Sequence, residues 1–161
     1  MNKLLKIFGV IITIIIITYG ILLLLNGFAI GGFFTTKISY DKMEEIFNED
    51  YSHLFTVANF LANLNYEEIY ISNTMSDGII SVSGKNVEIK DMTIINSINT
   101  LKNHDYEVII KEKNTVSFQR YSTLDVGGGV LFSVNGQKPT LQSVTRLQKL
   151  DKENWYYYEE N

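Results

Sequence analysis

The chain has 161 residues, no cysteine, and 14 basic against 18 acidic side chains. The lack of cysteine excludes disulfide bonds, thiol nucleophiles, zinc–thiolate sites and iron–sulfur clusters. Lys3 and Lys6 are the only charged residues before position 37, so the rest of the chain holds 12 basic and 18 acidic residues, a net charge of −6. Because phosphate binding needs a basic face, this acidity argues against nucleic acid as a partner.

Residues 1–25 predict a single transmembrane helix. The stretch 4–25 is almost entirely apolar, with Lys6 as its only charge. A helix of that length spans about 33 Å, and the hydrocarbon core of a bilayer is about 30 Å thick. The basic residues at its start predict a cytoplasmic N-terminus by the positive-inside rule. We therefore expect a single-pass protein of the cell membrane with an extracytoplasmic C-terminal domain.

A cleaved secretory signal is the alternative for this segment. Such signals have apolar stretches of about 7–15 residues, shorter than the one present. A small-x-small cleavage site nevertheless exists at Gly27-Phe28-Ala29. We favour the retained anchor, with the lipid bilayer as its partner. Residues 26–38 are rich in Gly and Phe, and we interpret them as a juxtamembrane hinge that leads into a domain at 39–161.

The domain begins with a helical pattern. Asp41 and Glu44 have the spacing of an N-cap and capping box, and apolar residues recur from there to Leu61 at three- and four-residue steps. The polar run 48–50 leaves open a division into two helices. A second helix is predicted after Asp91, its N-cap, and ends near 103–104. Its buried stripe is expected to comprise Ile94, Ile95, Ile98 and Leu101.

Short strands are predicted from β-branched and aromatic runs bounded by Gly, Asn and Asp turns. They cover residues 68–72, 79–83, 87–90, 106–111, 115–121, 130–134, 143–150 and 155–159. Residues 124–129 predict a loop, and Asn135-Gly136 is a hairpin signal between the strands on either side of it. Together these elements predict an α+β domain in which two helices pack on one face of a mostly antiparallel sheet.

Residues 61–69 resemble residues 101–109. Leu, Asn, Tyr, Glu and Ile coincide at a spacing of 40 residues, and both copies fall where a predicted helix ends and a strand begins. Two helix-plus-hairpin repeats account for this match, and so does the same junction chemistry arising twice. We favour the repeat.

No catalytic, metal or cofactor site is predicted. His53 lies beside Ser52 and Asp50 on one helix, where neighbours point apart and do not converge as a triad does. We interpret His104 as a residue at a helix C-terminus. The glycines at 127–129 are interpreted as a flexible connection or a strand bulge, because a phosphate loop needs Gly-Lys-Ser/Thr before a helix. The adjacent glutamate pairs at 44–45, 67–68 and 159–160 are interpreted as surface charges.

The closing strand 155–159 is the most distinctive stretch, because it contains the only tryptophan and three consecutive tyrosines. On a strand, Trp155 and Tyr157 face one way and the other two tyrosines face the opposite way. The first pair is expected to pack under the helices. The candidate binding surface, for a protein or a glycan, comprises Tyr156, Tyr158, Tyr121 and Tyr70.

Several features from residue 130 onward occur together. They are an apolar strand at 130–134, the turn Asn135-Gly136 followed by Pro139, the pair Leu147 and Leu150, and a closing Asn-Trp-Tyr-Tyr at 154–157. With the anchor, they resemble small, uncharacterised exported proteins of low-GC bacteria that carry an N-terminal membrane or lipid anchor. The resemblance implies export and anchoring, and it assigns no catalytic residue.

From these features we expect a membrane-tethered, non-enzymatic module that binds a protein or a cell-envelope component. An immunity-type protein that neutralises a secreted toxin is the alternative, because it needs an acidic docking face and the domain is acidic. A cell-envelope hydrolase is a second alternative. It is disfavoured because nothing in the sequence gathers polar groups into a concave site.

Overall fold

The computed structural model describes residues 37–122, 127–140 and 143–161, which belong to one compact unit, Thr36–Asn161. The predicted anchor at 1–25 and most of the predicted hinge lie outside the described residues. Within those residues, neither helix combines the length and the apolarity needed to cross a bilayer.

Helix α2 (Tyr40–Asn63) begins one residue before the predicted capping box. The N-cap is Ser39, whose hydroxyl accepts a hydrogen bond from the backbone N–H of Lys42 at 3.4 Å. Ser is a favourable N-cap because its short side chain reaches an N–H of the first turn that has no partner within the helix. Asp41 therefore lies in the first turn and is not the cap, which corrects the prediction.

The polar run 48–50 does not interrupt α2, which is one continuous helix. Asp50 lies on the buried side of the helix and Glu49 on the exposed side. The buried residues recur at helical spacing between Met43 and Leu61, as the sequence predicts.

Helix α3 (Met92–Asn103) matches the prediction closely. The Asp91 side chain caps its start by accepting a hydrogen bond from the backbone N–H of Thr93 at 2.8 Å. His104 is the C-cap, and its own N–H closes the last turn. Of the predicted stripe, Ile94, Ile98 and Leu101 are buried, whereas Ile95 is half-buried.

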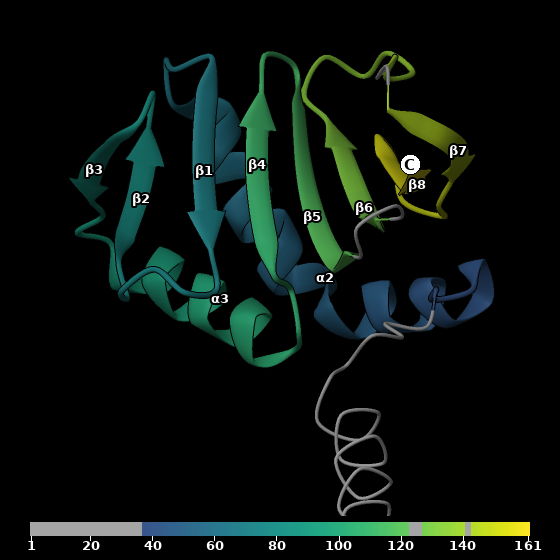
Figure 1. The fold of residues 1–161 in the computed structure, drawn as a ribbon, viewed down its shortest axis with the longest axis horizontal. Coiled ribbons are helices and arrows are strands. Elements are labelled where there is room, and N and C mark those ends of the chain that lie inside the picture. The colour runs from purple at the N-terminus through teal and green to yellow at the C-terminus, as the bar shows by residue number, and fades with distance from the viewer. Residues whose placement is uncertain (1–36, 123–126, 141–142) are drawn as a thin grey trace, which may run out of the picture. The chain divides into compact units, whose positions relative to one another are not determined.

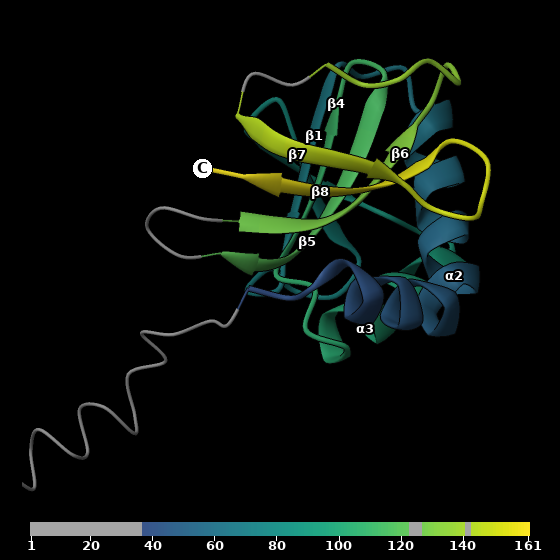
Figure 2. The ribbon, with the colours of Figure 1, turned by 90° about the vertical axis from the view of Figure 1, so that its right-hand side faces the viewer.

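Eight strands form one sheet in the order β3-β2-β1-β4-β5-β6-β8-β7, and every neighbouring pair is antiparallel (Figure 1). The strands are β1 (Glu68–Ser72), β2 (Ile79–Val82), β3 (Lys85–Glu88), β4 (Val108–Glu112), β5 (Thr115–Ser122), β6 (Gly127–Ser133), β7 (Val144–Lys149) and β8 (Trp155–Glu160). The sheet is strongly twisted, so that β7 and β8 cross the direction of β1 and β4 (Figure 2). The expected α+β fold, with two helices packed against an antiparallel sheet, is confirmed.

The two helices and the sheet enclose a single main core. Buried side chains of both helices and of β1, β2, β4, β5, β6 and β8 belong to it. Trp155 lies at its centre, fully buried, with its ring 5.2 Å from Phe47, 5.7 Å from Phe118 and 5.1 Å from Phe132 between centroids. Tyr157 is also buried in this core. We call the sheet face toward the helices the inner face and the opposite one the outer face.

The hairpin expected at Asn135-Gly136 is wrong. Gly136 does adopt the left-handed conformation of a turn, with φ at 72°. However, β6 pairs with β5 and β8, whereas β7 pairs with β8. The chain leaves β6 through a longer connection to the far edge and returns through a β7–β8 hairpin, which places β8 between them. A turn signal fixes local backbone direction, but it does not fix which strand becomes the neighbour.

The glycines at 127–129 belong to strand β6, so the loop predicted at 124–129 ends earlier than expected. A side chain at Gly129 would overlap the backbone carbonyl oxygen of Phe118 on β5. Beside these glycines the register of β5 shifts between Gln119 and Tyr121. The expectation of a strand bulge is thus confirmed here, and the glycines permit the close approach of the two strands.

The 40-residue echo coincides with element boundaries. α2 and α3 end at Asn63 and Asn103, and β1 and β4 cover Glu68–Ser72 and Val108–Glu112. β1 and β4 are also direct neighbours at the middle of the sheet, and Tyr70 pairs with Ile110, its own counterpart 40 residues later.

Candidate binding surface

The four tyrosines of the candidate surface do not form one exposed patch, which corrects the expectation of an aromatic platform. Tyr156 and Tyr158 do lie on the outer face, as predicted, but their exposed fractions are only 9% and 3%. They pack with Leu131 into a second small core that Val144 and Leu147 of β7 border. Burial raises the pKa of the Tyr158 phenol above its ordinary value of 10.

The other two tyrosines lie apart from this pair. Tyr121 is buried in the main core on the inner face, where burial raises its pKa. Tyr70 lies on the outer face of β1 and is 41% exposed. Of the four, Tyr70 alone presents a substantial part of its ring to solvent, and it lies on the part of the outer face that no helix covers.

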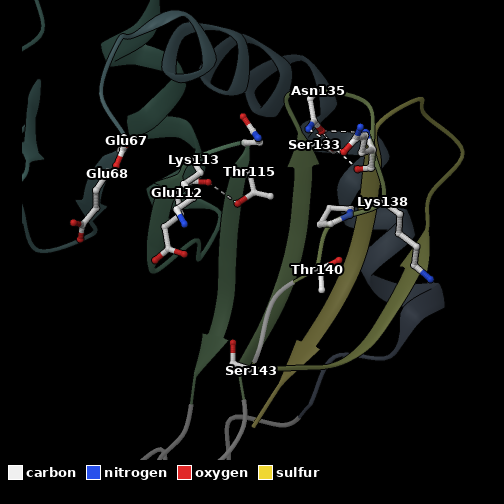
Figure 3. Close-up of a pocket in the computed structure, with 13 residues that line it drawn as sticks. Glu67, Glu68, Glu112, Lys113, Thr115, Ser133, Asn135, Lys138, Thr140 and Ser143 are labelled. Carbon is white, nitrogen blue, oxygen red and sulfur yellow. Dashed lines mark hydrogen bonds between the residues drawn. The ribbon is translucent and has the colours of Figure 1, made fainter.

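A groove of about 910 Å³ lies next to this part of the outer face (Figure 3). The ends of β1, β4 and β5 form one side, and the connection after β6 forms the other. Its lining residues are Glu67, Glu68, Glu112, Lys113, Asn114, Thr115, Ser133, Asn135, Gln137, Lys138, Pro139, Thr140 and Ser143. Nearly all of them carry a charge, an amide or a hydroxyl, so the groove is suited to a polar ligand. The sequence gave no signal for it, because its walls come from four separated segments.

Three carboxylates dominate the electrostatics of the groove. Glu68 and Glu112 are direct partners across β1 and β4, and such neighbours have Cβ atoms about 5 Å apart on the same face. Among the ion pairs formed within the described residues, none involves Glu67, Glu68 or Glu112. Like charges placed directly opposite destabilise a sheet. The lysine at 138 extends away from the carboxylates in Figure 3.

Hydrogen bonds hold the connection that forms the other wall. The Ser133 hydroxyl donates to the carbonyl oxygen of Gln137 at 2.6 Å, and the backbone N–H of Gln137 donates to the Asn135 side chain at 3.1 Å. The N–H of Val134 donates to the carbonyl oxygen of Asn114 at 2.8 Å, which links this wall to the β4–β5 turn. The groove is therefore largely formed before any ligand binds.

Asp50 is a residue whose position the sequence reasoning missed. It is 3% exposed and accepts a hydrogen bond from Nδ1 of His104 at 2.6 Å, and its second oxygen lies 3.7 Å from the Arg120 guanidinium. Arg120 also stacks over the Tyr106 ring, 5.3 Å from the centroid. Burial and the Asp50 charge raise the pKa of the Tyr106 phenol. This cluster joins α2, α3 and β5, and no groove adjoins it among the described residues.

The histidines were expected to be a solvated helix residue and a capping residue. His104 is the C-cap of α3, as expected, and it also pairs with Asp50. His53 is half-buried and contacts the Ser97 hydroxyl at 3.4 Å, so it is not simply solvated. Within the described residues, no cluster of histidine and carboxylate side chains has the composition of a metal site.

Glu159 is not the surface charge that its adjacency to Glu160 suggested, since it is 5% exposed. The Tyr157 hydroxyl donates to it at 2.7 Å, Arg146 pairs with it at 3.2 Å, and Lys37 forms an ion pair with its other oxygen. The same Tyr157 hydroxyl lies 2.9 Å from the carbonyl oxygen of Ile38. Lys37 and Ile38, which the predicted hinge included, thus contact the last strand.

Comparison of the chain with models of protein families, with curated proteins and with solved structures found no match in any of the three. The functional argument therefore depends on the groove and on the chemistry of its walls.

Proposed function

We propose that this chain is a membrane-tethered, non-enzymatic module whose extracytoplasmic domain binds a protein or a cell-envelope component in the groove. The observation that carries the proposal is the pair Glu68 and Glu112. These two carboxylates face each other across neighbouring strands, next to the exposed ring of Tyr70, and they line a preformed polar cavity. An arrangement that is unfavourable for the isolated fold suggests a role in binding.

The apolar segment 4–25 supports the tether, and its flanking charges support the outward orientation of the domain. The absence of cysteine allows a direct test, because any introduced cysteine is unique. A single cysteine in place of the exposed Glu153 should react with a membrane-impermeant maleimide on intact cells and remain in the membrane fraction. Labelling only after lysis would contradict the orientation, and recovery in the medium would indicate cleavage.

Site-specific photocrosslinking in native membranes tests the binding function. A photoreactive residue at Asn114 or Gln137 in the full-length protein would lie in the groove, whereas one at Ser52 would lie on an exposed position of α2. We expect crosslinked products from the two groove positions and none of the same mass from position 52. Equal products from all three positions, or none from the groove, would contradict the proposal.

An immunity-type protein is the second candidate, and the acidity of the groove favours it, since a basic toxin would be attracted to such a surface. It would use the same groove, so crosslinking captures either kind of partner. A crosslinked product that is a secreted toxin, together with protection of cells against that toxin, would identify this candidate.

We also infer that the domain contains two helix-plus-strand repeats related by an offset of 40 residues. The shared ends of α2 and α3 and the equal bounds of β1 and β4 support it. Further support comes from the register, in which Ile69 pairs with Lys111 and Ile71 with Ile109. An offset of 40 exchanges these two pairs, as a two-fold axis between Tyr70 and Ile110 would.

A further inference from the structure

We propose that the occupant of the groove is an extended segment of a partner protein that places an arginine or lysine between Glu68 and Glu112. This inference depends on the proposed binding function, and it adds the chemical class of the partner. A cation at this position would pair with both carboxylates and remove the repulsion between them. No charged group among the ion pairs of the described residues does so.

The neighbourhood of the two carboxylates fits a long basic side chain. Tyr70 lies two residues after Glu68 on β1 and therefore on the same face, with 41% of its surface exposed. An aromatic ring beside carboxylates binds guanidinium well, because the planar group stacks on the ring while its N–H groups pair with the acids. Arg120 stacks on Tyr106 beside Asp50 in the same way elsewhere in this domain.

The rest of the lining favours an extended peptide over an apolar helix. Thr115, Asn135, Gln137 and Thr140 provide hydroxyl and amide groups along the groove, and an extended backbone has N–H and C=O groups free to bond with them. A helix would satisfy those groups internally and would need an apolar trough.

Long-range electrostatics point in the same direction. The chain from residue 37 onward carries a net charge of −6, which attracts basic partners and repels acidic ones before contact. A neutral glycan would gain nothing from this field, and a phosphate-rich polymer would be repelled. Among the candidate ligands, the charge of the groove therefore selects a basic protein segment.

Neutralising the two carboxylates tests the inference. The full-length protein with a photoreactive residue at Gln137 would be compared with the same protein carrying Glu68→Gln and Glu112→Gln. A matched control carries Glu88→Gln and Glu153→Gln, two exposed glutamates outside the groove, and so has the same net charge. The crosslinked segment of the product would be identified by mass spectrometry.

We expect the groove variant to lower the yield of crosslinked product about tenfold and the control less than about twofold, since two exposed ion pairs are lost in one case and only long-range charge in the other. The identified segment should contain an arginine or lysine next to the crosslinked residue, and added salt should reduce the yield of the unmodified protein. A partner that crosslinks equally to the groove variant, or a product that is a glycan, would overturn the basic-segment inference while leaving binding intact. No product from the unmodified groove would overturn both.

Discussion

Glu159 shows how a single carboxylate can be held charged inside a fold. Burial acts to raise its pKa, but the contacts with Lys37, Tyr157 and Arg146 outweigh burial and place the pKa below the ordinary value of 4.5. Its partners come from the first described residue, from β7 and from β8 itself. The carboxylate therefore connects the start of the domain to its last two strands.

Replacing Glu159 by Gln should change the acid stability of the protein. Because the folded state binds the proton less tightly than the unfolded state, the ionised carboxylate stabilises the fold above the ordinary pKa, and this contribution is lost as the pH falls through the lowered pKa. We expect Glu159→Gln to lower the free energy of unfolding by about 1–3 kcal/mol at pH 7 and by much less at pH 3. Urea titrations at both values measure this, with the exposed Glu153→Gln as the control. An equal loss at both values would contradict the lowered pKa.

Lys111 acts at the scale of an element, because it completes the C-terminus of α2. Its side chain is 4% exposed, and its ammonium group donates to the carbonyl oxygens of Leu64 and Tyr66 at 2.6 Å each. Burial lowers its pKa. Carbonyls at a helix end lack partners within the helix, and a cation there also suits the helix dipole. We expect Lys111→Met to cost about 1–3 kcal/mol, measured by urea unfolding. Lys90→Met, on an exposed lysine, should be nearly neutral.

Asp50 is the second prediction at the scale of elements, because it joins α2 to α3 and β5. Asp50→Asn should cost about 3 kcal/mol, since Arg120 is left with an uncompensated and mostly buried charge. Arg120→Met in the same protein should recover part of that loss, with a coupling of about 1 kcal/mol or more in a double-mutant cycle. Additive losses would show that the two residues stabilise the elements separately.

The sequence predicted the elements well and their partners poorly. The bounds of β1 and the stripe of α3 follow from local periodicity, and that information is complete within a short stretch. The placement of β8 between β6 and β7, by contrast, depends on which edge can bury Trp155 and Tyr157 under α2. Likewise, the groove arises from segments that meet only after the sheet forms, so no local pattern indicates it. The buried position of Asp50 was concealed by the polar run around it.

At the scale of the whole molecule, the described domain has its own core and closes on its own first residues. Trp155, the single tryptophan, is fully buried at the centre of that core, so its fluorescence reports unfolding directly. Lys37 and Ile38 contact Glu159 and Tyr157. A binding module that is held near a membrane would transmit any pull on its partner through these first residues, into the strand that the core buries most deeply.

A chain that consists of residues 37–161 should therefore fold without the preceding segment and unfold in one cooperative transition of Trp155 fluorescence. Removing two more residues, to leave 39–161, should preserve the fold but lower the free energy of unfolding by about 1–2 kcal/mol, because one hydrogen bond to a backbone carbonyl and one partly exposed ion pair are lost. Lys37→Met in the longer chain separates the two contacts, and it should account for the smaller share, since the Lys37 side chain is 57% exposed. Equal stability of the two chains would show that these contacts do not secure the start of the domain to β8, and the point where the tether becomes free would then lie after Ile38.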